Sequence, residues 1–298
     1  MDKKSRFAGL FFCITAAVIW GFAFVAQTTG SDHITPFYFN GTRFLLGAVA
    51  LLPVALIFER TERDNPAKLK KTIICSSVTG VLLFLASYFQ QLGIDITRSP
   101  GKAGFITGLY MVIVPIIGVF MKKRTPLRCW IGALLGAVGL FLICTNGGRI
   151  VFTLGDLVLI AAAVVFAFHI ISIDSFGDHV YSLRFTVVQF VSCAVINLVC
   201  AFIFEEPSLV QIKDAAIPIL YCGILSSGVG YTFQVLGQKR SDPTSASIIF
   251  STESVFSAIG GALILREVMH TEAYIGCALI FAGIIISQVQ FNIRKKKG

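Results

Sequence analysis

Two ionisable residues lie inside long apolar stretches of the chain, where a charge needs a partner. Arg43 is the only charge in residues 36–58, and Glu253 is the only charge in residues 243–265. A guanidinium presents a rigid fork of donors that fits a carboxylate, whereas a carboxyl group can carry a proton or bind a cation. Alternatively, Arg43 snorkels or bonds a backbone carbonyl, and Glu253 is protonated and bonded to a neighbouring helix. Both alternatives stay open.

Further polar and aromatic side chains lie within the same kind of stretch and are candidates for lining a pocket. His169 can change its charge near neutral pH and relay protons, or it can be a neutral packed residue. Trp20 can stack on a substrate ring or cover a gate, or it can pack in the core. The other candidates are tyrosines and glutamines, whose donors would be costly to leave unsatisfied in lipid. They are Tyr88, Gln90, Tyr110, Gln189, Tyr231 and Gln234.

The composition indicates what kind of scaffold holds these groups. Hydrophobic residues make up 55% of the 298 residues and charged residues 14%, whereas soluble domains carry about 25% charged residues. So few charges cannot cover a soluble body of this size, which excludes a soluble enzyme, a secreted disulfide scaffold and a disordered chain. No G-x-x-x-x-G-K-S/T, H-E-x-x-H or G-x-S-x-G motif occurs, so we expect neither enzymatic chemistry nor a cofactor or metal.

Ten segments are long and apolar enough to cross a bilayer as helices. About 20 residues, at about 1.5 Å each, span the ~30 Å hydrocarbon core. Eight of the segments are uncharged, and the other two contain Arg43 and Glu253. We therefore predict an all-α integral membrane protein with ten transmembrane helices. The segments are residues 7–31, 36–58, 72–94, 103–121, 129–148, 157–173, 185–204, 215–238, 243–265 and 273–293.

The basic residues set the expected orientation in the membrane. If the N-terminus is cytoplasmic, 19 of the 25 Lys and Arg residues lie on the cytoplasmic side, five lie outside and Arg43 lies within a span. This positive-inside bias places both termini in the cytoplasm. The net charge of +9 is therefore accounted for by basic residues that set the topology and attract anionic lipid head groups. No nucleic acid partner is expected.

The two halves of the chain repeat each other. The sequence FQQLG at residues 89–93 recurs 144 residues later as FQVLG at 233–237, and Ile131-Gly132 recurs as Ile275-Gly276. A chance match explains the glycines easily but explains the five-residue motif poorly. Corresponding residues in the two copies are Tyr110 and Glu253, Arg43 and Gln189, and Phe22 and His169.

Each copy contains five predicted helices, and this odd number has a topological consequence. The second copy must enter the membrane from the side opposite to the first, which makes the two copies inverted repeats. We place the copies at residues 7–146 and 153–290. Two such halves can rock about a site near the membrane midplane and expose it to each side in turn.

These features resemble the EamA-like branch of the drug/metabolite transporter superfamily. The similarity covers about residues 8–290, but Ser254 follows Glu253 where the family often has Pro. The resemblance implies a multi-pass carrier in the cytoplasmic membrane of a bacterium, commonly an exporter of amino acids, metabolites or toxic compounds. It rests on Trp20-Gly21, Arg43-Phe44-Leu45-Leu46, the spacing of Pro243, Ala246 and Glu253, residues 261–267, Ile275-Gly276 and Ala282-Gly283.

We therefore expect a secondary transporter, not an enzyme, that exports small organic metabolites such as amino acids or drug-like compounds by alternating access. Substrate gradients, exchange and coupling to protons all stay open as driving forces. The alternative is a membrane-embedded lipid-modifying enzyme with Glu253 or His169 as base, which predicts a polar cluster at the membrane interface. Gly132-x-x-x-Gly136 permits close helix contact, either within the chain or in a homodimer, and Gly104-x-x-x-Gly108 permits the same.

Overall fold

The computed structural model describes residues 3–59, 65–122, 125–145, 152–176, 180–266 and 268–288, and their regular structure is helical. Among these residues, eight helical segments are long and apolar enough to cross a membrane. Two further apolar helices, within 127–142 and 271–287, are shorter. An all-helical protein with multiple candidate spans is therefore confirmed, and the count of ten spans stays a prediction.

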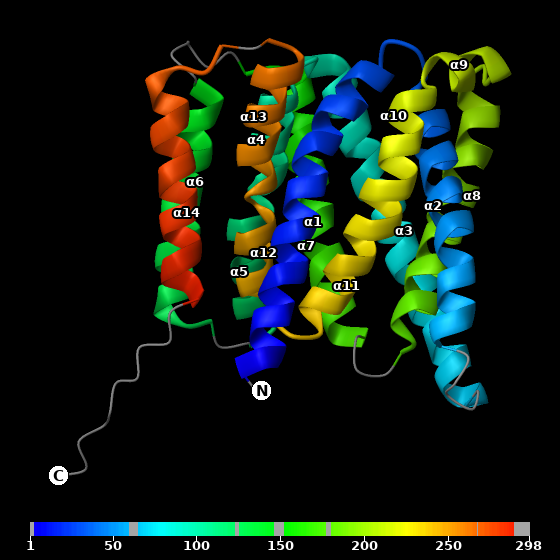
Figure 1. The fold of residues 1–298 in the computed structure, drawn as a ribbon, viewed down its shortest axis with the longest axis horizontal. Helices are drawn as coiled ribbons and strands as arrows, with labels where there is room; N and C mark the ends of the chain where they lie inside the picture. The colour runs from blue at the N-terminus through cyan, green and yellow to red at the C-terminus, as the bar shows by residue number, and fades with distance from the viewer. Residues whose placement is uncertain are drawn as a thin grey trace.

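The first half of the chain forms six helices that lie along one common direction (Figure 1). Proline begins α2, α3 and α4, where its missing N–H would have had no partner within the helix. α3 is longer than its predicted span because the helix continues through charged residues at its start. The helices are α1 (Lys3–Gly30), α2 (Pro36–Phe58), α3 (Pro66–Thr97), α4 (Pro100–Gly108), α5 (Tyr110–Phe120) and α6 (Leu127–Thr145).

The second half repeats this order with two local differences, the short extra helix α9 (Leu209–Asp214) and a π-helical segment. Its third span, residues 216–238, is continuous but is wound in the middle as a π-helix, η2. The ends of the two predicted copies, residue 146 and residues 289–290, lie outside the described residues. The elements are α7 (Leu154–Phe176), α8 (Ser182–Phe204), α9 (Leu209–Asp214), α10 (Ala216–Leu220), η2 (Tyr221–Tyr231), α11 (Thr232–Gln238), α12 (Pro243–Phe250), α13 (Glu253–Ile264) and α14 (Thr271–Gln288).

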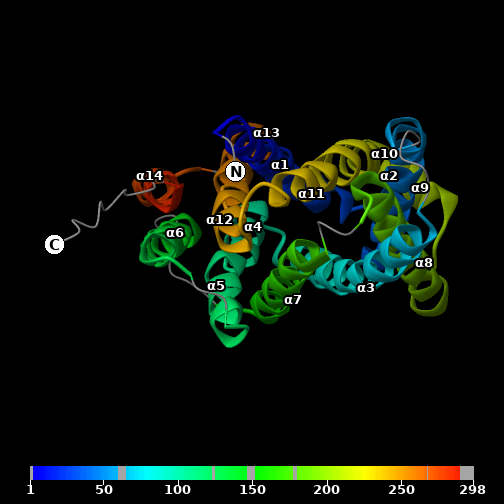
Figure 2. The ribbon, with the colours of Figure 1, turned by 90° about the horizontal axis from the view of Figure 1, so that it is seen from below.

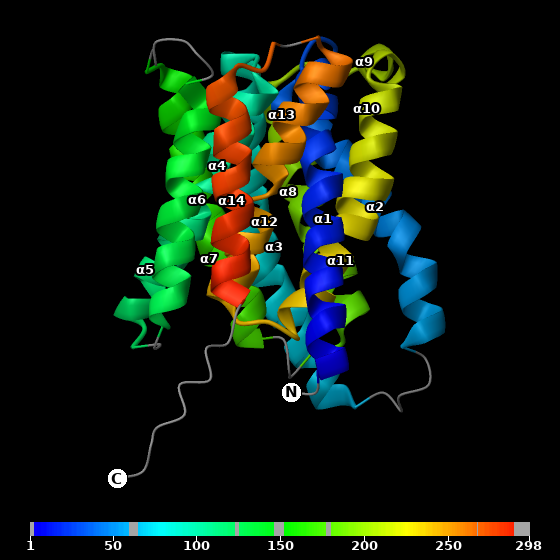
Figure 3. The same ribbon diagram turned by 60° about the vertical axis from the view of Figure 1, so that its left-hand side comes forward.

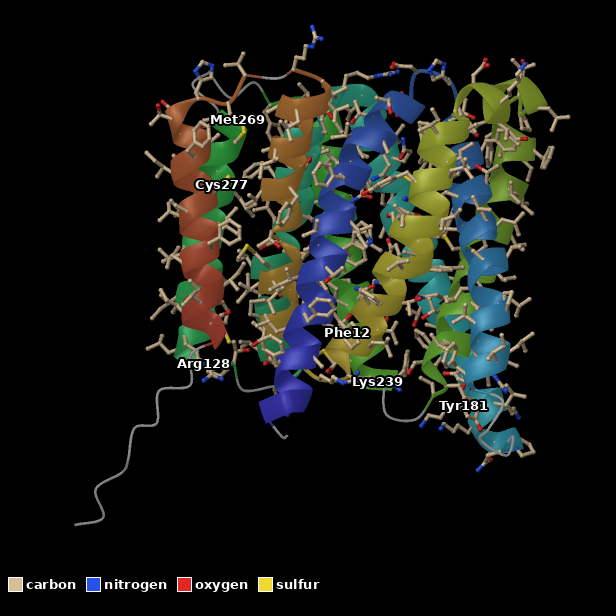
Figure 4. The ribbon with its side chains drawn as sticks, in the orientation of Figure 1. Phe12, Arg128, Tyr181, Lys239, Met269 and Cys277 are labelled. Atoms are coloured by element: carbon tan, nitrogen blue, oxygen red, sulfur yellow. The ribbon has the colours of Figure 1, made fainter. Side chains whose placement is uncertain are left out.

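The two halves begin at opposite ends of the bundle. α1 starts beside the turn that follows α11, where Gly9 packs against Arg240. α7 starts at the other end, where Gly155 packs against Thr97 at the end of α3. We call these ends the N-terminal face and the distal face. Figure 4 labels Phe12, Arg128, Tyr181 and Lys239 toward the N-terminal face and Met269 at the distal face.

The described basic residues are unevenly divided between the two faces. Beyond those at the start of α1, the N-terminal face carries Lys68, Lys70, Lys71, Lys122, Arg128, Arg184, Lys239 and Arg240 at helix ends. The distal face carries Arg98, Lys102, Lys213 and Arg266. The orientation also relied on Arg60, Arg63, Lys123, Arg124, Arg149 and residues 294–297, which lie outside the described residues. A cytoplasmic N-terminal face therefore stays a prediction.

Helices from one half pack mainly against helices from the other. α6 lies beside α14 at one flank of the bundle, and α2 lies beside α8 at the opposite flank (Figures 1 and 2). Between the flanks, α1 packs on η2 and α11, while α3 packs on α7. Figure 3 shows α6 and α14 side by side from a third direction. α6 and α14 are corresponding helices of the two copies, as are α2 and α8, and the packing of α1 on η2 and α11 corresponds to that of α7 on α3. This arrangement is that of two halves related by an approximate two-fold axis.

Glycines allow α6 and α14 to touch along their backbones. A Cβ atom on Gly132 would lie 2.7 Å from the carbonyl oxygen of Gly283, and one on Gly139 would lie 2.5 Å from that of Gly276. Gly104 likewise packs against the side chain of Ser257 in α13. These glycines therefore serve packing within the chain, which is one of the two uses predicted for the G-x-x-x-G patterns.

α2 and α8 cap each other at both faces. Glu205, at the end of α8, accepts hydrogen bonds from Thr35 Oγ1 and two backbone N–H groups at the start of α2, at 2.6–3.0 Å. Glu59, at the end of α2, accepts from two backbone N–H groups at the start of α8, at 2.8 and 3.0 Å. Each carboxylate satisfies free N–H groups and complements the helix dipole, so this flank is held at both ends.

Candidate functional site

Two helix breaks place corresponding residues of the two copies at the centre of the bundle. The fourth predicted span breaks into α4 and α5 at Leu109, and the ninth breaks into α12 and α13 at Ser251 and Thr252. At each break a backbone N–H, that of Leu109 or Thr252, bonds the carbonyl three residues earlier, at 3.2 and 3.1 Å. Such tight turns often mark hinges. Tyr110 is the first residue of α5, and Glu253 is the first residue of α13.

Tyr110 and Glu253 meet across these breaks. Tyr110 Oη donates a hydrogen bond to Glu253 Oε1 at 2.9 Å. Both residues are buried, at 3% and 4% exposure. Among the residues that the structure describes, no Lys or Arg forms an ion pair with Glu253. The carboxyl group is therefore held by a neutral donor.

Arg43 is the fixed cation of the site. It lies two turns into α2, is 2% exposed, and its Nε donates to Asn40 Oδ1 at 2.8 Å. Asn40 in turn donates to the carbonyl oxygen of Ser87 at 3.0 Å. The guanidinium carbon lies 4.6 Å from the centre of the Phe44 ring. Within the described part of the chain, no acidic side chain pairs with Arg43, and its Nη2 has no hydrogen-bond partner.

A narrow pocket between the two halves is lined by both Arg43 and Glu253. Seven predicted candidates line it: Trp20, Arg43, Gln90, Tyr110, Tyr231, Gln234 and Glu253. Seven other lining residues were not predicted: Ala23, Phe24, Gln27, Thr107, Phe166, Ile170 and Ser226. Gln27 could have been predicted from the sequence, because it is an uncharged polar residue in an apolar span, as Gln90 is. The apolar members carried none.

The pocket lies on the approximate two-fold axis. Three pairs of corresponding residues line it: Tyr110 and Glu253, Gln90 and Gln234, and Ala23 and Ile170. Beside it, the corresponding residues Phe44 and Phe190 pack together with ring centres 5.6 Å apart. Arg43 breaks the symmetry because its counterpart, Gln189, does not line the pocket. A nearly symmetric pocket therefore carries one asymmetric charge.

Trp20 joins the pocket wall to the π-helix. Its Nε1 donates to the carbonyl oxygen of Ser226 within η2 at 3.1 Å. Its ring lies 4.9 Å from that of Tyr231 and 5.4 Å from that of Phe250, measured between ring centres. Trp20 is therefore both packed and pocket-lining, so its two predicted uses are compatible. π-helical turns recur at functional sites in helices.

Three predicted candidates lie outside this pocket. His169 and Gln189 are fully buried, and His169 Nε2 lies 3.3 Å from Gln189 Oε1. Tyr88 stacks on Phe37 of α2, with ring centres 3.9 Å apart. The structure thus brings His169 and Gln189 together but separates both of them, and Tyr88, from the pocket that contains Arg43.

The pocket combines complementary hydrogen-bonding groups with aromatic walls. Arg43 Nη2 is a buried donor without a partner, whereas Gln27 Oε1 and Gln234 Oε1 are buried acceptors without partners. Buried polar groups are rarely left unpaired, because each costs about 1–3 kcal/mol. The site therefore suits a small molecule with an anionic end and hydrogen-bond donors. Among the described residues, no cluster of three or more His, Cys, Asp or Glu suits a metal ion.

Comparisons with known proteins cover nearly the whole chain. The model of the EamA-like transporter family matches residues 7–145 and 153–288. An uncharacterized transporter of Archaeoglobus fulgidus is 27% identical over 272 residues, covering 91% of this chain and 82% of that protein. The uncharacterized transporter YoaV of Bacillus subtilis is 26% identical over 293 residues, covering 95% and 97%.

A solved structure supports the same fold. A crystal structure aligns with a TM-score of 0.78 over 94% of this chain and 98% of that chain, at 18% identity. At this identity the likeness shows the fold alone. The family model, in contrast, matches both halves of the sequence. The chain therefore belongs to the EamA-like transporter family.

Proposed function

We propose that this protein is a secondary transporter that moves small carboxylate-bearing metabolites, such as amino acids, by alternating access. The family match and the multi-pass helical fold support the transporter role. The observation that carries the mechanism is the pocket on the two-fold axis, lined by corresponding residues of both halves. A site between inverted halves opens to either face when the halves exchange conformations.

The substrate class follows from the charges of the pocket. Arg43 offers its unpartnered Nη2 to an anionic group, and a guanidinium fits a carboxylate. Gln27 and Gln234 offer acceptors to an ammonium or hydroxyl group, and Glu253 adds a carboxyl group on the far side. An amino acid presents both kinds of group on one small molecule. A drug-like compound would have to bring its own acceptor to Arg43.

The proposed setting is the cytoplasmic membrane of a prokaryotic cell, with ten spans and a cytoplasmic N-terminal face. Export then runs from the N-terminal face to the distal face, driven by a solute gradient, by exchange or by protons. Proton coupling would act through Glu253, whose buried carboxyl group accepts a hydrogen bond from Tyr110 and can take up and release a proton. A homodimer is not required, because the glycine-rich faces of α6 and α14 cover each other.

The lipid-modifying enzyme is not favoured by any observation. That alternative predicted a polar cluster at a membrane interface with Glu253 or His169 as base. Glu253 instead lies at a helix break in a pocket between the halves. His169 is fully buried and lies outside that pocket. We therefore propose no enzymatic activity.

The test is transport by the purified full-length protein in proteoliposomes. Labelled amino acids and simple carboxylates are loaded inside, and efflux and exchange are followed. We expect at least one of them to be carried, and the Arg43→Gln variant to carry it more slowly at low solute concentration because its KM is higher. Lys213→Gln, which removes an exposed positive charge at the distal face, is the matched control. No flux of any tested solute by monodisperse wild-type protein would contradict the proposal.

A further inference from the structure

A second group of unpaired polar atoms lies on the N-terminal side of the pocket. His169 Nδ1 and Gln189 Nε2 have no hydrogen-bond partners, although both residues are fully buried. Gln238 donates from Nε2 to the carbonyl oxygen of Ile170 at 2.9 Å, but its Oε1 is unpaired. α7, α8 and α11 each supply one of these side chains. Leaving buried polar groups unpaired is costly. We therefore expect these three side chains to bind a ligand in some state of the protein.

One layer of aromatic rings separates this group from the pocket. The His169 ring lies 6.0 Å from that of Tyr231 and 6.4 Å from that of Phe166, between ring centres. Tyr231 and Phe166 both line the pocket. Phe190, the neighbour of Gln189 in sequence, lies 5.7 Å from Tyr231 in the same layer.

The repeat relates this group to the Arg43 site. Gln189 corresponds to Arg43, and each lies seven residues from the first residue of its helix, Ser182 in α8 and Pro36 in α2. Because the two helices start at opposite faces, the residues lie at equal depths, about 10 Å from the helix start. Arg43 lines the pocket in this state, whereas Gln189 is packed behind the rings. If each half of the chain took up the conformation that the other half has now, Gln189 would line the pocket and Arg43 would be packed away from it.

We propose that Gln189, His169 and Gln238 form a second substrate station, which lines the cavity when it opens to the N-terminal face. The inference rests on the proposed alternating access and deepens it. Gln189 Oε1 accepts a hydrogen bond from His169 Nε2–H, which leaves Gln189 Nε2 free to donate to the carboxylate. His169 Nδ1 and Gln238 Oε1 then accept from the ammonium or hydroxyl group of the same solute.

The two stations differ in strength. Arg43 holds a carboxylate by a hydrogen bond and by the attraction of its positive charge, whereas Gln189 offers a hydrogen bond from an uncharged donor. The solute is therefore held more tightly in the state that exposes Arg43 than in the state that exposes Gln189. The apparent affinity for a carboxylate is accordingly expected to be lower at the N-terminal face than at the distal face.

The station is tested without knowing the substrate, by the accessibility of an introduced thiol. The background is the full-length protein with its eight native cysteines replaced. Gln189→Cys is compared with Ala194→Cys, five residues further along α8, where Ala194 is equally buried and has no polar side-chain atom. The probe is the membrane-impermeant anionic reagent 2-sulfonatoethyl methanethiosulfonate, added to one face of oriented vesicles.

We expect the Gln189→Cys thiol to react from the N-terminal face alone, and at least about tenfold faster than the Ala194→Cys thiol even if the open state is a minor one. Reaction at equal rates, from the distal face alone, or from neither face would overturn the station. A thiol introduced on α7 by His169→Cys is expected to react in the same way. This variant replaces Gln189→Cys if the latter does not fold. Reactivity without any solute flux would refute the proposed function alone, and flux without reactivity would refute the station alone.

Discussion

The hydroxyl group of Tyr110 donates a hydrogen bond to the carboxyl group of Glu253 at 2.9 Å, although the two residues hold the same place in two copies of one repeat. Corresponding residues can touch only near the axis that relates the copies. Phe44 and Phe190 are also corresponding residues that touch, with ring centres 5.6 Å apart. When the two halves exchange conformations, these contacts between them must rearrange. The pocket therefore lies where the two halves move relative to each other.

The role of Glu253 in coupling is tested by Glu253→Gln. The amide keeps the size of the side chain and can still accept from Tyr110, but it cannot take up or release a proton. If protons drive transport, the variant loses flux driven by a pH difference and keeps solute exchange at equal pH. Both are measured in proteoliposomes, with Glu206→Gln, at an exposed position just after α8, as the control. Full pH-driven flux in Glu253→Gln would remove this residue from the coupling mechanism.

The reciprocal caps of α2 and α8 predict a stability effect at each face. Glu205→Ala removes the acceptor of three hydrogen bonds at the start of α2, and the expected loss in free energy of unfolding is about 0.5–2 kcal/mol. Glu59→Ala is expected to act similarly at the start of α8. Thermal unfolding in detergent measures both, against Glu206→Ala, whose side chain is exposed. Equal melting temperatures for all three variants would argue against the caps.

The backbone contact between α6 and α14 predicts that a single methyl group is harmful there. Gly132→Ala would place its Cβ 2.7 Å from the carbonyl oxygen of Gly283, and overpacking of this kind costs about 1–3 kcal/mol. At Gly118 the nearest atom to a new Cβ is 3.8 Å away, so Gly118→Ala is expected to leave the melting temperature unchanged or raised. A Gly132→Ala protein as stable as Gly118→Ala would contradict the close approach.

The helices were predictable because long uncharged stretches are visible in sequence, and α2 spans the predicted residues 36–58. The breaks beside Tyr110 and Glu253 were not predictable in this way. In the second break, the hydroxyls of Ser251 and Thr252 bond carbonyls three residues earlier, which bends helices without interrupting the apolar pattern. The π-helical turns of η2 likewise leave the composition of the span unchanged.

Arg43 and Glu253 were identifiable as candidates because a charge in an apolar stretch stands out. Tyr88 and Gln90 looked alike as polar positions of one span, yet Gln90 lines the pocket while Tyr88 stacks on Phe37. Which face of α3 meets the pocket depends on packing against the other half of the chain. The pairing of His169 with Gln189 depends in the same way on how α7 and α8 come together.

The most direct test of the account is the exchange of a labelled carboxylate solute by wild-type protein and by Arg43→Gln, with Lys213→Gln as control. Loss of one hydrogen bond to a charged group, at about 1.5–3 kcal/mol, predicts a KM for the carboxylate that is roughly 10- to 100-fold higher in Arg43→Gln. Lys213→Gln is expected to match the wild type. A KM for the carboxylate that is the same in all three proteins would contradict the central claim that Arg43 binds the substrate.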